Sequence, residues 1–297
     1  MIVIRSTHGN DFLVLPTLPM ASTARIRRIF HPTDLRDGSV TAFFHALRLT
    51  VAAPATLTIL HVASERDEVE MGSLPHVRDT LVKWGIITDG TAVDELTAMR
   101  IGVHKVVVDD APVQACLDHL DHHPTDLIVL HTTQRAGRST WLAPRVSEPL
   151  MRSAGELTLL VPEGVPGFVV ANTGEVRLRR FLIPLAAAPA PQQSVDMAAG
   201  IADLLEVKDA EFHLLHVGDD GDMPRVHTPE RKGWRWIEVT RNGPVVDTIL
   251  QLERDLRPDL LVMTTQGHDG FLDALRGSTT ERVLRHIRCP LLTAVSK

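Results

Sequence analysis

A glycine-rich stretch near the end of the chain has the residue types and spacing of a phosphate-binding loop. Gly267 and Gly270 follow the apolar run DLLVM, and Gly277, Ser278 and Thr279 lead into the amphipathic segment TTERVLRHI. Glycine lets the backbone approach a ligand closely, and the free N–H groups at a helix start favour a phosphate. The same spacing also fits a structural arrangement in which the glycines make turns and Ser278 or Thr279 caps the helix.

Other side chains are weaker candidates for chemistry. His268, between the two loop glycines, could touch a phosphate or act as a weak base, but it has no evident acid–base partner. Cys116, His119 and His123 would share one helix face at a spacing that suits zinc, yet a fourth ligand is not evident, so we assign no metal site. The chain has no nucleophile elbow, Walker loop or paired-carboxylate motif, which disfavours a dedicated catalyst.

The elements that would position these residues occur twice. Four sequence blocks recur in the same order: RRIFHPTDL and RRFLIPLAA, LTILHV and FHLLHV, TDLIVLHTTQ and PDLLVMTTQ, ELTLLVP and PLLTAVS. Four collinear matches indicate two copies of one domain. His61 and His216 occupy matched strand ends, a position that predicts hydrogen-bonded structural histidines and not a catalytic pair.

Each copy alternates short apolar runs with longer amphipathic runs. The apolar runs are rich in Leu, Val and Ile throughout, as strands buried on both faces must be. This alternation predicts an α/β fold of two tandem open parallel five-stranded sheets, Rossmann-like, with helices on both faces. Between its second and third strands the second copy has only a short stretch rich in Gly, Pro and Asp, so we expect it to lack a helix there.

These patterns divide the chain into four parts. Residues 1–26 form an N-terminal extension, 27–164 the first domain, 165–178 a joining ribbon and 179–297 the second domain. Asn172-Thr173-Gly174, between two alternating runs, is a hairpin signal within the ribbon.

Composition limits the partners. The chain has 297 residues, 44% of them hydrophobic, and a net charge of −6 with Lys and Arg scattered among Asp and Glu. Such a charge distribution predicts binding to neither a nucleic-acid backbone nor an anionic membrane. No apolar run reaches the length of a membrane helix, two cysteines are too few for a disulfide framework, and no signal peptide is evident, so we expect a cytoplasmic protein.

Several motifs together resemble the universal stress protein family. They are Pro32-Thr33-Asp34 after the first strand, Leu-His-Val ending at Val62 and again at Val217, and the glycine loop followed by a helix and a final apolar strand. The resemblance covers about residues 27–297 as two tandem domains. It implies a nucleotide-binding fold in which the acidic residue after the first strand contacts adenine, while the glycine loop and its Ser or Thr hold ribose and phosphates.

In this sequence those implied roles are divided between the copies. The first copy keeps Asp34 but has lost most of the loop glycines, whereas the second keeps the loop and has Ala186 in place of the Asp. The resemblance therefore favours a site in the second copy, formed by Gly267, His268, Gly270, Gly277, Ser278 and Thr279, with adenine held by backbone groups near Val217. The spacer from Gly270 to Gly277 is shorter than in nucleotide-binding members, which implies a tighter loop.

We accordingly expect a stress-response or signalling module that binds ATP or AMP, with Mg²⁺, and does not catalyse a reaction. A protein partner would recognise its nucleotide-bound state. Two alternatives stay open: slow ATP hydrolysis or phosphotransfer on the second domain, and a scaffold that has lost its nucleotide. The family pairs domains through their last strands, so one chain would form an internal pseudo-dimer, with room for a homodimer of chains.

Overall fold

The computed structural model describes residues 26–63, 75–90, 92–109, 112–132, 157–188, 190–265 and 279–296. The first copy contains five strands and four helices within these ranges: β1 (Arg28–Thr33), α1 (Asp37–Ala52), β2 (Thr56–Ala63), α2 (Val77–Lys83), α3 (Ala92–Ala98), β3 (Gly102–Asp109), α4 (Pro112–His122), β4 (Leu127–Thr132) and β5 (Leu157–Pro162).

The second copy repeats this order with one difference. Its elements are β6 (Arg180–Leu185), α6 (Pro191–Leu204), β7 (Ala210–Val217), the 3₁₀ turn η2 (Asp220–Asp222), β8 (Trp234–Arg241), α7 (Val245–Leu256), β9 (Leu260–Thr265), α9 (Thr279–Leu284) and β10 (Leu291–Val295). Only η2 lies between β7 and β8, where the first copy has α2 and α3, as the composition of that stretch predicted.

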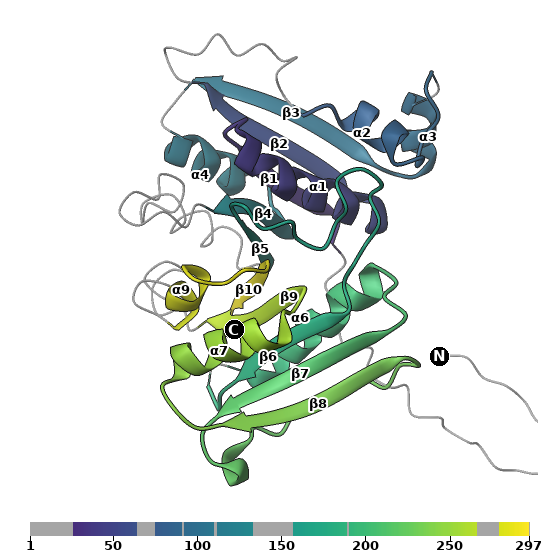
Figure 1. Ribbon diagram of the computed structural model, residues 1–297. Helices are drawn as coiled ribbons and strands as arrows, with labels where there is room; N and C mark the ends of the chain where they lie inside the picture. The colour runs from purple at the N-terminus through teal and green to yellow at the C-terminus, as the bar shows by residue number, and fades with distance from the viewer. Residues whose placement is uncertain are drawn as a thin grey trace, which may run out of the picture.

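All ten strands form one sheet, in the order β3-β2-β1-β4-β5-β10-β9-β6-β7-β8 (Figure 1). Within each copy every strand pair is parallel. The predicted fold, two tandem five-stranded parallel sheets with helices on both faces, is therefore confirmed. Each half has the strand order 3-2-1-4-5, so the direction of winding reverses between the first and fourth strands of each copy.

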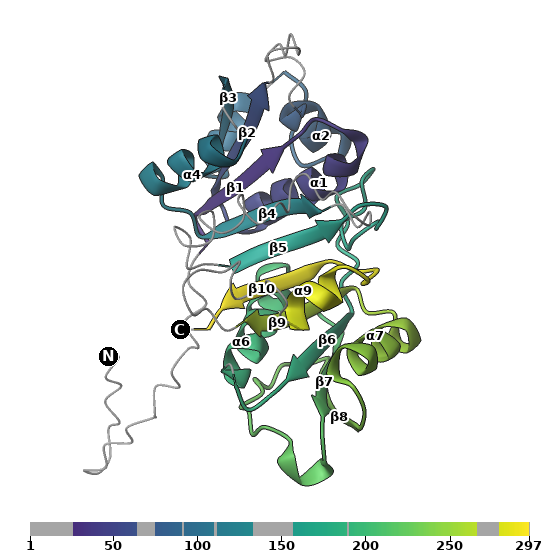
Figure 2. The same cartoon turned by 90° about the vertical axis from the view of Figure 1, so that its left-hand side faces the viewer.

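One antiparallel pair, the β5–β10 junction, joins the halves (Figure 2). Leu159 faces Leu292 and Leu160 faces Leu291, and each of these side chains is at most 1% exposed. The last strands of the two copies thus pair within one chain, as the resemblance implied.

The core lies in two layers, one on each face of the sheet. One layer packs α1, α2 and α6 against side chains such as Ile29 and Phe181, and it continues across the β5–β10 junction. The other packs α4, α7 and α9 against their sequence neighbours, such as Phe30 and Leu182. Successive strand residues point to opposite faces, and both faces are covered, which explains why β1 and β4 are buried almost throughout.

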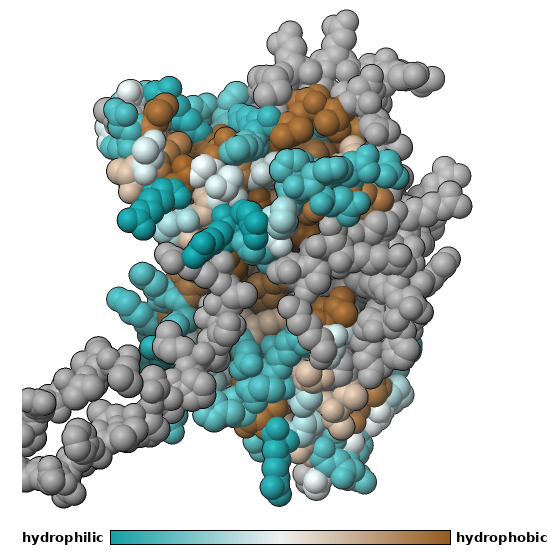
Figure 3. All heavy atoms as spheres, turned by 180° about the vertical axis from the view of Figure 1, so that it is seen from behind, coloured by the Kyte–Doolittle hydropathy of each residue, from teal (hydrophilic) through white to brown (hydrophobic). Residues whose placement is uncertain are grey.

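The surface is correspondingly mixed. Figure 3 shows apolar residues scattered among polar ones on the face seen from behind. Among the described residues the large apolar side chains that are exposed are Val40, Val93 and Val245, on three different helices.

The ribbon between the copies contains an antiparallel bridge between Val169 and Val176 and is fastened to the first copy by His45 of α1. The Phe168 N–H donates to His45 Nε2 (3.0 Å), and His45 Nδ1–H donates to the Thr41 carbonyl (2.7 Å). His45 is 0% exposed, and burial lowers its pKa to about 4. A neutral ring is required, because its Nε2 must accept a hydrogen bond.

We predict that this histidine makes the fold acid-sensitive. Because the folded pKa of about 4 lies below the ordinary 6.5, the free energy of unfolding is undiminished above pH 6.5 and falls as the pH drops from 6.5 to 4, by about 3 kcal/mol at most from this group. Buried His31, whose pKa is also lowered to about 4, adds a second decrease of the same sign.

His45→Gln keeps an acceptor for the Phe168 N–H but cannot take up a proton. In urea unfolding at several pH values, the free energy of unfolding of this variant should therefore fall less steeply toward low pH, by the contribution of one proton. His45→Leu removes the acceptor as well and should cost about 1–3 kcal/mol at every pH. Equal pH slopes in the wild type and His45→Gln would contradict the assignment.

A second prediction concerns the β5–β10 junction. Thr158 and Thr293 face each other across it, both 0% exposed, and neither hydroxyl has a hydrogen-bond partner within the described ranges. Replacing both by Val removes two unsatisfied polar groups and should raise the free energy of unfolding by about 1 kcal/mol. The control is Thr50→Val, which deletes a buried hydrogen bond to the Ala46 carbonyl (2.7 Å) and should lower it. Calorimetric melting distinguishes the two; a lower melting temperature for Thr158→Val/Thr293→Val would refute the prediction.

Candidate functional site

Parallel strands in each half end at a common carboxyl edge, which is where ligands of open α/β sheets bind. Of the residues predicted from sequence, Asp34 follows β1, Val217 ends β7 and Thr279 begins α9. The remaining predicted residues, Gly267, His268, Gly270, Gly277 and Ser278, lie outside the described residues, directly after β9 and before α9.

Asp34 lies at the carboxyl edge of the first copy with its side chain 11% exposed. Its Oδ1 accepts the Arg36 N–H (3.1 Å), and its Oδ2 lies 3.9 Å from Arg36 Nε. The Arg36 side chain is 77% exposed, so this ion pair contributes little. The carboxylate is thus held by the turn that leads into α1.

Three buried histidines lie beside Asp34, on the face of the sheet that α1 covers. His31 Nδ1–H donates to the Val129 carbonyl (2.9 Å), and His61 Nδ1–H donates to the Thr33 carbonyl (2.9 Å). His131, in β4, packs against the start of α1: a Cβ added to Gly38 would lie 2.8 Å from its Nε2. In all three rings Nε2 is buried without a hydrogen-bond partner in the part of the chain that the structure describes.

Burial disfavours protonation of two of these rings, His31 and His131. It lowers the pKa of His31 to about 4, against the opposing effects of the Val129 carbonyl and Asp34. Burial likewise lowers the pKa of His131, while Asp34 and Glu163 raise it. The first copy therefore places a carboxylate next to rings that have a free acceptor nitrogen.

The second copy replaces most of this cluster by apolar side chains. Ile183 and Leu185 stand where the first copy has His31 and Thr33, and Thr264 stands in place of His131. The Ser194 hydroxyl lies 3.2 Å from Thr264 Oγ1 and accepts the Thr264 N–H (3.1 Å), which ties α6 to β9.

His216 is kept at the carboxyl edge of the second copy, where its Nδ1–H donates to the Leu185 carbonyl (3.3 Å). Its Nε2 and the Thr265 hydroxyl are both buried with no partner in the described ranges. Together with the His61 bond to Thr33, this confirms that the matched histidines are hydrogen-bonded to neighbouring strands, as their equivalent positions predicted. Val217, next to His216, is half-buried, and so is Thr279, the first residue of α9.

The geometry of α4 disfavours the zinc site that the sequence left as an alternative. Cys116 is 0% exposed, and burial raises the pKa of its thiol to about 12, which disfavours the thiolate that zinc requires. His119 stacks on Phe30 (ring centroids 5.0 Å apart) and on His123 (4.2 Å). Within the described ranges, no three His, Cys, Asp or Glu side chains are grouped so that they could hold a metal ion.

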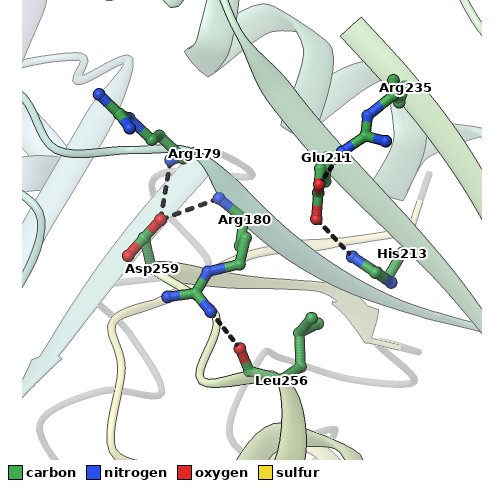
Figure 4. Close-up of polar contacts among 7 residues, drawn as sticks. All are labelled: Arg179, Arg180, Glu211, His213, Arg235, Leu256 and Asp259. Atoms are coloured by element: carbon green, nitrogen blue, oxygen red, sulfur yellow. Dashed lines mark hydrogen bonds and ion pairs between the residues drawn. The ribbon is translucent and has the colours of Figure 1, made fainter.

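The opposite, amino edge carries a carboxylate at the same place in both copies. Asp126 Oδ2 accepts the N–H groups of Arg27 and Arg28 (2.9 Å each), and Asp259 Oδ2 accepts those of Arg179 and Arg180 (2.8 Å each; Figure 4). Each aspartate thereby fixes the start of the first strand of its copy against the fourth. This repeated arrangement is structural, because the carboxylate oxygen is used by the backbone.

The copies differ in the side-chain hydrogen bonds of the second arginine of each pair, Arg28 and Arg180. Arg28 Nη2 donates to Asp126 (3.0 Å), whereas Arg180 Nη1 donates to the Leu256 carbonyl (2.8 Å). Across the strands, Arg180 is in register with Glu211, and Glu211 with Arg235, to which it is ion-paired (Figure 4). A cavity of about 640 Å³ lies among these strand starts, lined by Arg179, Arg180, Asp209, Ala210, Glu211, Gly233, Trp234 and Arg235.

Sequence reasoning did not single out His31, His131 or the amino-edge aspartates. The two aspartates are visible as matched positions in the repeated block that begins TDLIVL and PDLLVM, but nothing in the sequence says that they bond to Arg27 and Arg179. The second copy has other residues at the positions of His31 and His131. Alignment of the two repeats is therefore the one sequence signal that could have identified these histidines.

Comparison with known proteins agrees with this geometry. A family model described as the universal stress protein family matches residues 25–162 and 235–294. No curated protein matches the sequence. Among solved structures, a universal stress protein from Archaeoglobus fulgidus is 16% identical, with a TM-score of 0.57 over 91% of this chain and 96% of its own.

Two further structures show how far the similarity extends. A functionally unknown protein from Pseudomonas aeruginosa is 14% identical, with a TM-score of 0.50 over 91% of this chain and 93% of its own. A universal stress protein family protein from Arabidopsis thaliana, solved with AMP bound, is 16% identical and covers 40% of this chain and 92% of its own, with a TM-score of 0.29. At these identities, the similarities to the Archaeoglobus fulgidus and Pseudomonas aeruginosa proteins establish the fold.

The site geometry predicts the effect of removing the Asp34 charge. Asp34→Asn should lower the pKa values of His131 and His31 further, because the carboxylate favours the protonated form of both rings. Imidazole titration followed by NMR measures this shift, with exposed Asp118→Asn on α4 as the control. Unchanged titration of both rings in Asp34→Asn would contradict the arrangement.

Proposed function

Since the chain belongs to the universal stress protein family, we propose that it binds an adenine nucleotide at the carboxyl edge of its second copy and acts as a non-catalytic signalling module in the cytoplasm. In this proposal residues 27–164 and 179–297 are two universal stress protein domains, joined by 165–178 and preceded by the extension 1–26. Within the described ranges no helix is long and apolar enough to cross a membrane.

The observation that carries the proposal is a pair of buried polar atoms at this edge. His216 Nε2 and Thr265 Oγ1 have no hydrogen-bond partner among the described residues, and buried polar groups are seldom left unpaired. They lie at the carboxyl ends of β7 and β9: His216 is next to Val217, and Thr265 is two residues before Gly267, where the glycine loop begins. The matched atoms of the first copy, His61 Nε2 and Thr132 Oγ1, are unpaired there too, so the glycine loop after β9 is what favours the second copy. A nucleotide bound here would place its base over Val217 and its phosphates against the loop.

The adenine base would be bound differently here than in a site that has a carboxylate after its first strand. Ala186 follows β6 where the first copy has Asp34, so the base would be held by packing on Val217 and by backbone groups at the ends of β6 and β7. Phosphates would be held by the backbone of Gly267, Gly270 and Gly277 and by the hydroxyls of Ser278 and Thr279. The short spacer favours AMP over ATP, since fewer phosphates need to be enclosed.

The proposed output is a change of conformation. A ligand shifts a protein between states only by as much as its affinity for those states differs. The loop from Gly267 to Ser278 joins β9 to α9 and so to β10, which pairs with β5 of the other copy. Nucleotide held by this loop would therefore favour one arrangement next to the β5–β10 junction, which a protein partner could recognise.

The test begins with freshly purified protein. Denaturation followed by chromatography identifies any nucleotide that it carries, and calorimetric titration of the stripped protein with AMP, ADP and ATP, with and without Mg²⁺, measures affinity. We expect one adenine nucleotide per chain, with binding abolished by Gly277→Val.

A matched pair of variants distinguishes the copies. Val217→Ala should weaken binding about fivefold by removing apolar contact with the base, whereas the equivalent Val62→Ala in the first copy should leave the affinity unchanged. Absence of released nucleotide and of binding heat with all three nucleotides would overturn the proposal in favour of a scaffold, and turnover of ATP lost in Gly277→Val would favour slow hydrolysis.

A further inference from the structure

Within the part of the chain that the structure describes, the outer edge of β8 has no strand paired with it. The ten-stranded sheet ends at β3 and β8, and β7 is the described strand that pairs with β8 (Figure 1). The junction of β5 with β10 uses the edges through which the two copies could otherwise pair with other chains. An exposed strand edge presents unpaired N–H and C=O groups that can bind another strand.

The hydrogen bonds of β8 identify which of its backbone groups are free. The Gly233 carbonyl accepts the Ala210 N–H, and the Arg241 carbonyl accepts the Gly218 N–H, so the odd-numbered residues direct their backbone groups toward β7. The backbone groups of Trp236, Glu238 and Thr240 therefore point to the outer edge. The Thr240 carbonyl already accepts a hydrogen bond from Arg241 Nη1 (3.1 Å).

In the second copy no α-helix lies between β7 and β8. The segment that leads into β8 is instead tied to the face of the sheet that α6 covers. The Trp236 Nε1–H donates to the Pro229 carbonyl (3.1 Å), Gln192 of α6 bonds to both backbone groups of His227, and Arg231 pairs with Asp203 of α6 (2.8 Å). These contacts hold the segment over one face, away from the outer backbone groups of β8.

The side chains of β8 define what could pair with it. On the face that α7 covers, the strand presents Arg235, Ile237, Val239 and Arg241, of which the arginines are exposed and the apolar pair is half-buried. Arg235 lies at the mouth of the amino-edge cavity, where it is paired with Glu211, and Arg180 is the next cation in the same cross-strand row (Figure 4). The pattern is basic, apolar, apolar, basic at alternate residues.

Charged residues on an edge strand commonly serve only to prevent aggregation. This role accounts well for the exclusion of a second copy. An antiparallel pair of β8 strands centred on Glu238 would oppose the two Glu238 side chains and place Arg235 opposite Arg241 of the second chain. The same charges would attract a strand with acidic residues at matching positions.

We propose that β8 is a docking strand for an extended segment of a partner protein that carries two acidic residues six positions apart with apolar residues between them. The segment adds an eleventh strand to the sheet. Its acidic side chains meet Arg235 and Arg241, its apolar ones cover Ile237 and Val239, and its backbone pairs with Trp236, Glu238 and Thr240. This site lies away from the carboxyl-edge loop, so the proposal goes beyond nucleotide binding.

The probe is a synthetic peptide, acetyl-Thr-Glu-Thr-Val-Thr-Val-Thr-Glu-Thr-amide, whose palindromic pattern fits either strand direction. Calorimetry with the full chain should show saturable binding, and the amide signals of Trp236 and Glu238 should shift in NMR spectra. The peptide with Lys in place of both Glu should not bind. Equal binding of the two peptides, or no binding of the Glu peptide at about millimolar concentration, would overturn the proposal.

Variants test the charge pattern on the protein. Arg241→Glu, on an exposed side chain, should weaken the Glu peptide about tenfold and permit binding of the Lys peptide. Lys105→Glu on β3, the other end of the sheet, is the matched control and should change neither affinity. Loss of Glu-peptide binding in Lys105→Glu would instead place the docking edge on β3.

N-methylated peptides test the backbone pairing without altering the protein. Methylation of every Thr amide blocks one edge of the peptide strand, and methylation of every Glu and Val amide blocks the other. One of these two peptides should bind and the other should not, because only one edge of an added strand faces β8. Equal affinity for both would show that no strand is added. A wild-type chain that is dimeric by light scattering, and that becomes monomeric when the Glu peptide is added, would show that a second copy occupies the edge.

Discussion

The antiparallel pairing of β5 with β10 is the interaction on which the rest of the structure depends. Each half is a parallel sheet that ends in a strand with one side unpaired, and such an edge would otherwise bind another chain. The junction pairs the two edges within one chain and lines them with Leu159, Leu160, Leu291 and Leu292, all nearly inaccessible to solvent. One apolar layer therefore runs across both copies.

Joining the copies in this way allowed each carboxyl edge to change separately. The first copy has Asp34 and three buried histidines beneath α1, and the Nε2 atom of each has no hydrogen-bond partner among the described residues. The second has Ile183 and Leu185 at the matching places and keeps His216 at its carboxyl edge. The amino edges are more alike, because Asp126 and Asp259 bond to backbone N–H groups that both copies need to hold the first strand against the fourth.

The two outer edges of the sheet also differ. In the first copy α2 and α3 precede β3, while in the second a 3₁₀ turn and a segment tied to α6 precede β8. The same segment falls outside the residues that the family model matches, which resume at residue 235 within β8. The unmatched stretch, residues 163–234, thus includes the segment that leads into β8.

The sequence by itself determined the α/β class, the two copies, the missing helix and the order of strands and helices, because hydrophobic periodicity and internal repetition are local and additive along the chain. The tertiary structure alone decided that His31, His61 and His131 gather beside Asp34, that Asp126 and Asp259 hold Arg27 and Arg179, and that β8 is an open edge. These contacts join residues that lie between 28 and 99 positions apart, or depend on which strand ends the sheet. They are fixed by the order of the strands within the sheet and by the register of their pairing. No local sequence pattern encodes either, although such patterns do give the order of elements along the chain.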